Sequence, residues 1–140
     1  MSSPASGVAG DFFQCDRVGE YLGVELLSLS PDRTTVRMEI QDRHLNLFGT
    51  VHGGVIFSLA DIAFGLAGNA EGISTVAIDA TISYLKSARS GTLHAEARRF
   101  SSQGRLSSYQ VIVTDQNGEE IALFMGMAYQ KSSPPLLLRE

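Results

Sequence analysis

Hydrophobic and polar residues alternate along much of the chain, which is the pattern of half-buried β-strands. About six stretches show this pattern, at 24–29, 35–40, 75–84, 92–100, 106–114 and 120–130. In the third, apolar residues occupy every second position from Val76 to Tyr84, and in the last they do so from Ile121 to Tyr129. Short turns such as SPDR, SSQG and DQNG favour antiparallel hairpins. We therefore expect an antiparallel sheet of about six strands, with one polar and one apolar face.

A different pattern lies between the second and third of these strands. From Gly54 to Gly68 only Ser58 and Asp61 are polar, so this stretch predicts a long helix that is apolar nearly all round. Such a helix must be covered on more than one side, and a single curved sheet covers only part of it. The expected fold is α+β, with the sheet wrapped around one long central helix and a partner subunit covering the rest.

The remaining segments lie near the two ends of the chain. A shorter helix is predicted near the start, with Asp11 as its N-cap and Gly23 as its end. Residues 1–10 and 132–140 are rich in small residues or prolines and are expected to be flexible ends. The chain has the length of one domain, so we expect a single domain over 1–140.

The composition excludes several classes of function. A hydrophobic share of 44%, a charged share of 19% and a net charge of -4 fit a globular protein and argue against a grip on nucleic acid. Cys15 has no partner for an internal disulfide, which fits a reducing compartment. The longest apolar run, 55–67, is shorter than the roughly 20 residues of a membrane span, and the start of the chain does not resemble a secretory signal. We expect a cytoplasmic protein that binds neither nucleic acid nor membrane.

Asp61 is the unusual residue of the predicted long helix. On a helical wheel it lies on a stripe of small residues, namely Gly54, Ser58, Gly65 and Gly68. Glycine costs a helix interior about 1 kcal/mol relative to alanine, and room beside the carboxylate is a reason to accept that cost. The positions four residues before and after Asp61 hold Phe57 and Gly65, neither of them a cation. We favour a catalytic role for Asp61 over a structural bond to another subunit.

The sequence HGG, from His52 to Gly54, precedes the apolar run. Free N–H groups at a helix N-terminus favour negative or partly negative oxygen, and glycine lets a ligand come close. Together with Asn46 and Asp61, these residues supply hydrogen-bond donors and a base. Taken alone, His52 is more often a structural histidine than a catalytic one.

These residues resemble a known family. The segment LNLFGTVHGGVIFSLADIAFGLAGNAEG is similar to the centre of hotdog-fold acyl-CoA thioesterases, most closely the phenylacetic acid degradation (PaaI-type) branch, and the similarity covers about 24–129. The resemblance implies a hotdog fold and an enzyme that hydrolyses a phenylacetyl or hydroxyphenylacetyl thioester to free acid and CoA. It also implies a homodimer with the active site at the interface, assembly into a homotetramer, and no cofactor other than the coenzyme A of the substrate.

The resemblance also implies a role for each catalytic residue. Asp61 corresponds to the carboxylate that activates water as a general base or attacks the carbonyl as a nucleophile. Gly53 supplies the N–H that polarises the thioester carbonyl, Asn46 positions water or carbonyl, and His52 accompanies them. Asp61 would face Asn46 and Gly53 of the opposite subunit. Some relatives carry a water-orienting hydroxyl where this chain has Ala77; the substitutes open to it are Thr75, Thr81 and Ser58.

Two groups of residues are candidates for substrate binding. Residues beside the catalytic aspartate could contact the acyl group: Gly54, Phe57, Ser58, Phe64 and Gly65, with Phe48 in the preceding loop. The aromatic ones suit a flat aryl group, although aromatics at helical spacing are more often core residues. Lys86, Arg89 and Arg105 could hold the phosphates of coenzyme A or could be solvated surface charges.

Two alternative functions remain open. A hotdog dehydratase or hydratase could use His52 with Asp61 as its acid and base pair. A non-catalytic acyl-CoA-binding module could share the fold, since fold does not determine function. The three histidines, His44, His52 and His94, are scattered and no zinc-like spacing occurs, so no metal site is expected.

Overall fold

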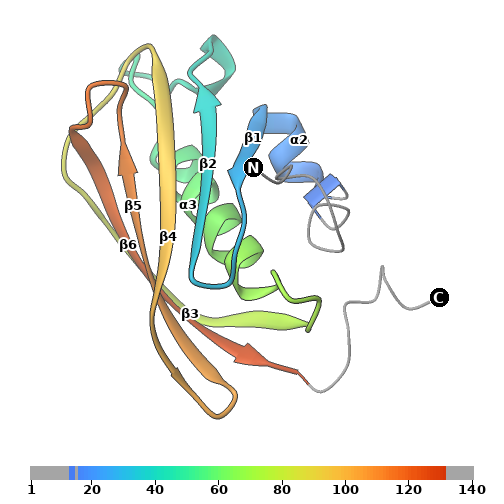
Figure 1. The fold of residues 1–140 in the computed structure, drawn as a ribbon. Coiled ribbons are helices and arrows are strands. Elements are labelled where there is room, and N and C mark those ends of the chain that lie inside the picture. Colours follow the sequence, from blue (N-terminus) through green and yellow to red (C-terminus); the bar gives the residue numbers. More distant parts are fainter. Residues whose placement is uncertain (1–12, 15, 132–140) are drawn as a thin grey trace.

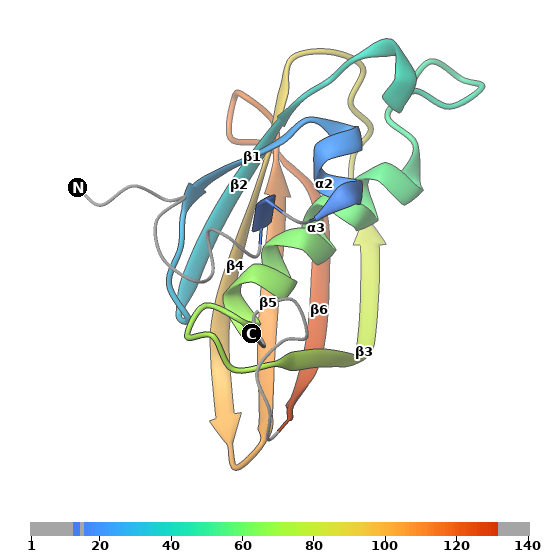
Figure 2. The ribbon, with the colours of Figure 1, turned by 90° about the vertical axis from the view of Figure 1, so that its right-hand side faces the viewer.

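The computed structural model, which describes residues 13–14 and 16–131, contains a six-stranded antiparallel sheet and one long helix. The elements in chain order are α2 (Arg17–Leu22), β1 (Val24–Ser28), β2 (Arg33–Glu39), a short 3-10 helix η1 (Asp42–His44), α3 (Gly53–Gly68), β3 (Thr75–Tyr84), β4 (Thr92–Gln103), β5 (Leu106–Thr114) and β6 (Glu120–Gln130). The strand order is β1-β2-β4-β5-β6-β3, and all neighbours are antiparallel. The sheet curves around α3 (Figure 1, Figure 2), as the α+β prediction required.

The core lies between α3 and the inner face of the sheet. Apolar side chains from both meet there and are fully buried, among them Met38, Leu59, Leu93, Val111 and Phe124. Gly126 of β6 allows close packing, because a Cβ atom at that position would lie 2.9 Å from the ring of Phe64. The ring of Phe64 therefore lies directly against the sheet.

Both ends of α3 are held by side chains. At the start, the His52 ring accepts a hydrogen bond from the Gly54 N–H. At the end, the Asn69 side chain donates to the Gly65 carbonyl and accepts from the Thr75 N–H, each at 2.8 Å. Asn69 thus connects the end of α3 to the start of β3, which determines where the helix lies relative to that strand.

The predicted face of the last strand is corrected by the structure. From Leu123 onward the alternating residues of the prediction, including Met125 and Tyr129, lie on the outer face, where these two side chains are 38% and 40% exposed. The residues that face α3 are the other set: Ala122, Phe124, Gly126 and Ala128. Both sets are apolar, so alternation alone could not distinguish them. Small residues face the core because α3 places phenylalanine rings there.

The third predicted strand, β3, is interrupted by a bulge. Its register against β6 shifts between Ala77 and Asp79, so that Ala77 pairs with Ala128 and Ala80 with Gly126, both on the α3 side. The single apolar face predicted from Val76 to Tyr84 is therefore wrong on the N-terminal side of the bulge. β3 is also an edge strand, and its Ile78 is 55% exposed in the single chain.

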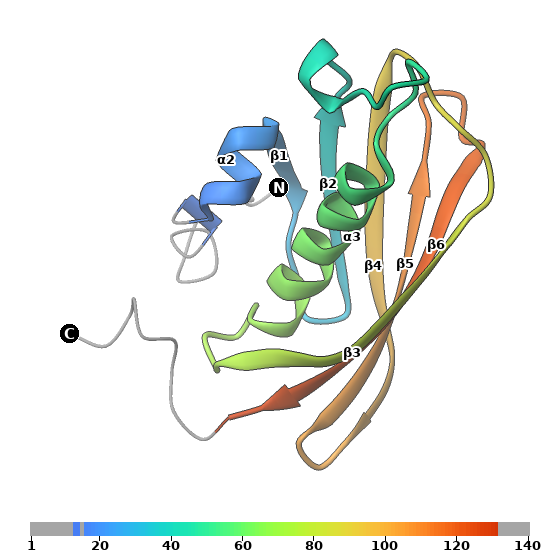
Figure 3. The ribbon, with the colours of Figure 1, turned by 180° about the vertical axis from the view of Figure 1, so that it is seen from behind.

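The short helix α2 lies on the side of α3 that faces away from β4, β5 and β6 (Figure 3). Its N-cap is Asp16, whose carboxylate accepts a hydrogen bond from the Gly19 N–H at 2.9 Å. Gly23, with a φ of 79°, ends it as predicted. The predicted N-cap Asp11 and the predicted flexible ends lie outside the described residues. No helix in the described ranges is long and apolar enough to cross a membrane.

Candidate active site

The stripe of small residues on α3 forms the face of the helix that the sheet leaves uncovered. Residues on the opposite side, such as Leu59, Ala60 and Ala63, are fully buried against the sheet, whereas Gly54 and Asp61 are exposed in the single chain. We expected α3 to be covered on more than one side. Within one chain, only the side that faces the sheet is fully buried. The carboxylate of Asp61 stands on the open side.

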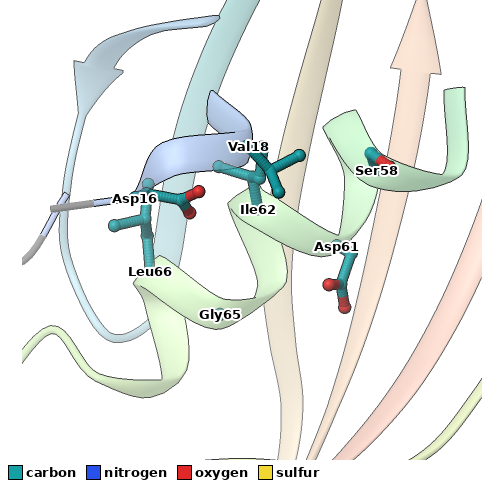
Figure 4. Close-up of a pocket in the computed structure, with 7 residues that line it drawn as sticks. All are labelled: Asp16, Val18, Ser58, Asp61, Ile62, Gly65 and Leu66. Carbon is teal, nitrogen blue, oxygen red and sulfur yellow. The ribbon is translucent and has the colours of Figure 1, made fainter. Parts of the chain in front are cut away.

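Asp61 borders two hollows. The larger, of about 280 Å³, lies between α2 and α3 and is lined by Asp61 together with Asp16, Val18, Ser58, Ile62, Gly65 and Leu66 (Figure 4). The smaller, of about 140 Å³, lies between α3 and β3, and its lining includes Asp61, Gly68, Thr75 and Ala77. The carboxylate thus stands between two spaces of different size.

The surroundings of Asp61 favour its neutral form. Among the described residues no cation forms an ion pair with it. The pKa of the Asp61 carboxyl is raised above its ordinary value of 3.8, first because nearby protein atoms displace water from it and second because of the negative charge of Asp16. A carboxyl with a raised pKa and no structural partner has the properties of a general base.

The N-terminus of α3 carries a free donor. The Gly54 N–H donates to Nδ1 of His52 at 2.9 Å, while the described residues provide no acceptor for the Gly53 N–H. The Tyr84 hydroxyl donates to the Gly53 carbonyl at 2.9 Å. A Cβ atom on Gly53 would lie 3.2 Å from the Tyr84 ring, a tight contact that favours glycine at this position. The structure shows a capping role for His52 and leaves the Gly53 N–H available to a ligand.

Asn46 organises the loop that precedes α3. Its side-chain oxygen accepts hydrogen bonds from the Phe48 N–H at 2.9 Å and from the backbone and hydroxyl of Thr50, each at 3.2 Å. The side-chain NH₂ has no partner among the described residues and can donate to a ligand. At the tip of this loop Leu47 and Phe48 are 87% and 72% exposed, so Phe48 is not a core residue of this chain.

Asp61 and the Gly53 N–H cannot act on the same carbonyl within one chain. The two residues are eight positions apart on a continuous helix, which separates them by about 12 Å along its axis. His52 lies one residue farther away. The structure therefore brings Gly53 and His52 together at one end of α3, and places Asp61 in its middle.

The residues predicted to contact the acyl group lie in two different parts of the structure, the core and the open side of α3. Phe57 packs edge-on against Phe124 and Phe64 packs against the same ring at a tilt, between α3 and the sheet. Phe64 also borders the smaller hollow beside Asp61. Gly54, Ser58 and Gly65 share the open stripe with Asp61, and Ser58 and Gly65 line the larger hollow.

The three predicted phosphate ligands are not brought together in one chain. Lys86 lies beside Gly53 and pairs with Glu119. Arg89 donates to the Phe48 carbonyl at 3.4 Å, beside the Asn46 loop. Arg105 lies at the other end of the sheet, where it donates to the Gln130 carbonyl at 3.3 Å.

The hydroxyls considered as substitutes for Ala77 also differ in position. Ala77 itself borders the smaller hollow with Asp61, and so does Thr75, whose hydroxyl donates to the Gly68 carbonyl at 2.8 Å. The Ser58 hydroxyl donates to the Gly54 carbonyl at 2.8 Å. Thr81 pairs with Met125, on the outer face, away from Asp61.

Three residues near the site were missed by sequence reasoning: Asp16, Val18 and Tyr84. Asp16 carried a recognisable signal, because an aspartate three residues before Gly19 can cap a helix. Val18 and Tyr84 carried none, because contacts across 31 or more residues depend on the fold.

His44 has a structural role. It is fully buried, its Nε2 lies 2.9 Å from the Leu22 carbonyl and its Nδ1 accepts the Gln41 N–H at 3.0 Å. Burial is the main cause that lowers the pKa of His44. No group of three or more potential metal ligands occurs within the part of the chain that the structure describes.

Comparison with known proteins identifies the family. The family model described as Thioesterase superfamily matches residues 48–122. The acyl-coenzyme A thioesterase PaaI of Escherichia coli is 30% identical over 131 residues, which are 93% of this chain and 94% of that protein.

Solved structures agree with this match. The structure of the E. coli PaaI protein from the phenylacetic acid degradation operon superposes with a TM-score of 0.86 at 30% identity, over 90% of this chain and 92% of that one. The smu.793 protein of Streptococcus mutans, solved with bound acetyl CoA, has a TM-score of 0.75 at 28% identity, over 80% and 91% of the two chains. The predictions of a PaaI-type relative, a hotdog fold and an enzyme that hydrolyses thioesters are confirmed. This chain belongs to the thioesterase superfamily and has its hotdog fold.

Proposed function

We propose that this protein hydrolyses acyl-CoA thioesters at an interface between two copies of the chain, with Asp61 from one copy and Gly53 and Asn46 from the other. The observation that carries the proposal is the separation on α3. The Asp61 carboxylate and the Gly53 N–H, neither of which has a partner among the described residues, lie about 12 Å apart along one helix axis. A second copy running in the opposite direction would bring each carboxylate close to a partner N–H.

Two surfaces of the single chain support such a pairing. β3 is an edge strand with exposed apolar side chains, Val76 and Ile78, and unpaired edges are sites of strand addition. The uncovered stripe of α3 is apolar or small except for Asp61 and Ser58. Both surfaces would face one partner, with the hollow beside Asp61 left between the two copies for the substrate. The apolar outer face of β6, with Met125 and Tyr129, offers a further surface on which two dimers could pack as a homotetramer.

The proposed chemistry needs only groups of the protein and water. In the general-base route, Asp61 takes a proton from water, the hydroxide oxygen bonds to the thioester carbon, and the carbonyl oxygen becomes negative. The Gly53 N–H and the Asn46 amide stabilise that oxygen more in the transition state than in the substrate. The C–S bond then breaks, and the thiolate of CoA leaves and takes up a proton. In the nucleophilic route the Asp61 oxygen itself bonds to the carbon, the C–S bond breaks and the thiolate of CoA leaves. Water then cleaves the resulting anhydride to the free acid and the Asp61 carboxylate.

The nature of the substrate is supported by the relatives. The E. coli relative is named as an acyl-coenzyme A thioesterase from the phenylacetic acid degradation operon, and the S. mutans protein was solved with acetyl CoA. We expect this chain to act on a phenylacetyl or hydroxyphenylacetyl thioester in the cytoplasm, with coenzyme A as the leaving group. Lys86 and Arg89, near the Gly53 end of α3, are the cations expected nearest the CoA phosphates.

The test is release of free CoA thiol from a panel of aryl and aliphatic acyl-CoAs, followed with a thiol-reactive dye. Hydrolysis of saturated thioesters that disappears in Asp61→Asn supports the proposal. Hydration of an enoyl-CoA without thiol release would instead support the hydratase alternative. Within one chain His52 caps the start of α3, nine residues before Asp61, so the two side chains do not form an acid and base pair there. Saturable CoA binding without turnover would indicate a non-catalytic module.

A further inference from the structure

The hollow between α2 and α3 contains a position where packing within the chain does not require glycine. A Cβ atom on Gly65 would have no atom within 4 Å in the described part of the chain, and the residue has no positive φ. A helix interior disfavours glycine, so the missing side chain needs another reason. Open space one turn after Asp61 is that reason.

The size and lining of this hollow suit an acyl group. Its volume is about 280 Å³, near the lower end of about 300 Å³ for small-molecule pockets. The smaller hollow on the β3 side, of about 140 Å³, has room for only a few water molecules at about 30 Å³ each. Val18, Ile62 and Leu66 give the larger hollow an apolar wall. Val18 is 53% exposed, so it contributes to this wall more than to the core.

The charge around the hollow is negative. Asp16 and Asp61 both line it (Figure 4), and neither forms an ion pair with a cation of the described residues. One oxygen of Asp16 accepts the Gly19 N–H, and the other is left without a partner in the described chain. A carboxylate on an incoming acyl group would meet two like charges here, which is an arrangement that rejects a ligand.

Building on the proposed function, we propose that this hollow receives the acyl group of the substrate, and that Asp16 makes the enzyme select neutral acyl groups over those that end in a carboxylate. Val18 and Gly65 then limit the size of the acyl group from the two sides of the hollow. Asp16 acts as a specificity residue and takes no part in the bond-breaking step.

The test compares pentanoyl-CoA with glutaryl-CoA, which have acyl chains of equal length and differ in the terminal carboxylate. Asp16→Asn is the informative variant, because asparagine caps a helix as well as aspartate does and only the charge is lost. We expect the ratio of kcat/KM for glutaryl-CoA to that for pentanoyl-CoA to rise about tenfold. Assays at about pH 8 keep the Asp61 carboxyl ionised in both proteins.

Glu20→Gln is the matched control. It removes the same charge from the same short helix, but Glu20 is exposed and pairs with Arg17 outside the hollow. This control should leave the ratio unchanged. A ratio that Asp16→Asn does not move, or that Glu20→Gln moves equally, would overturn the proposal.

A second variant tests the wall of the hollow. Val18→Phe should lower kcat/KM for phenylacetyl-CoA about tenfold more than for acetyl-CoA, with its melting temperature as a check on folding. Equal losses for both substrates would contradict the placement of the acyl group.

Binding distinguishes failure of this proposal from failure of the proposed function. The Kd values of two CoA thioethers, one with a pentyl and one with a carboxybutyl chain, are measured by calorimetry for the native chain and Asp16→Asn. Loss of discrimination in the variant supports the acyl site even if no thioester is hydrolysed. If both proteins discriminate equally between the two thioethers, the proposed role of Asp16 is rejected even if hydrolysis is fast.

Discussion

The Tyr84 hydroxyl donates a hydrogen bond of 2.9 Å to the Gly53 carbonyl, and a Cβ atom on Gly53 would lie only 3.2 Å from the Tyr84 ring. The end of β3 therefore holds the first residue of α3 in place. The residue that carries the Gly53 N–H is thereby anchored to the sheet through its carbonyl. This is the kind of preorganised donor that stabilises a developing negative charge.

Gly53→Ala should impair catalysis more than folding. The new Cβ atom would lie 3.2 Å from the Tyr84 ring, so the ring and the helix end must shift by a few tenths of an ångström. We expect a fall in kcat of about 10²-fold or more, the usual consequence of misplacing an oxyanion donor. Steady-state thiol release measures it.

Tyr84→Phe is the control for that variant. It keeps the ring and removes only the hydrogen bond to the Gly53 carbonyl, so it should cost about 1 kcal/mol in the free energy of unfolding and reduce kcat less than Gly53→Ala. A larger loss of kcat in Tyr84→Phe would mean that the hydroxyl itself contacts the substrate.

Asp61→Asn should separate activity from stability. Turnover should fall by several orders of magnitude because the base or nucleophile is lost. The folded pKa of Asp61 is raised above its unfolded value of 3.8, so the stability linked to its proton is present below that value and lost as the pH rises through the folded pKa. At neutral pH the variant should therefore unfold at the same temperature or higher than the native chain, as calorimetry can measure. Near-normal hydrolysis by a folded Asp61→Asn protein would disprove its catalytic role.

The pH dependence of kcat/KM should report the same carboxyl. If Asp61 must be ionised to act, the acid limb of the profile lies above the ordinary aspartate pKa of 3.8. Asp16→Asn removes the charge that is the second cause of this shift, so it should move the limb toward lower pH. A limb that stays in place would show that Asp16 does not influence Asp61 in the assembled protein.

Asn46 has two functions that two substitutions can separate. Asn46→Ala removes the side-chain oxygen that holds Phe48 and Thr50 as well as the free NH₂. Asn46→Asp keeps the oxygen and its loop contacts but has no NH₂ to donate. If the donor matters, both variants should lose about tenfold or more in kcat/KM, with a smaller loss of thermal stability in Asn46→Asp. Activity retained in Asn46→Asp alone would assign the residue to the loop only.

His44 should make stability depend on pH. Burial lowers the folded pKa of His44 below its unfolded value of 6.5, so the unfolded chain takes up the proton first as the pH falls. The stability linked to neutral His44 is complete above about pH 6.5 and is lost progressively toward the folded pKa. Denaturant unfolding of the native chain and of His44→Gln, at several pH values in this window, measures it. The variant should be less stable at high pH and should show a flatter pH dependence.

Much of the fold follows from local patterns. The strands and the long helix appear where alternation and helical spacing predicted them, and Gly23 ends α2 as expected. It was harder to predict which face of each strand points toward the core. On β6 both alternating sets are apolar, so only the space required by Phe64 decides that Gly126 faces inward. On β3 the bulge after Ala77 reverses which residues face inward and outward, and no residue pattern predicts this bulge.

The sequence by itself determined the helix, the glycine turn at its start and the carboxylate in its middle, because helical spacing and residue type are local properties. It also placed Asp61 on the stripe of small residues that the structure finds uncovered. Only the tertiary structure decided that Tyr84 anchors Gly53, that α2 brings Asp16 and Val18 beside Asp61, and that the carboxylate stands between two hollows. Those relationships join residues far apart in the chain, and the path of the backbone between them depends on the packing of the whole sheet around α3.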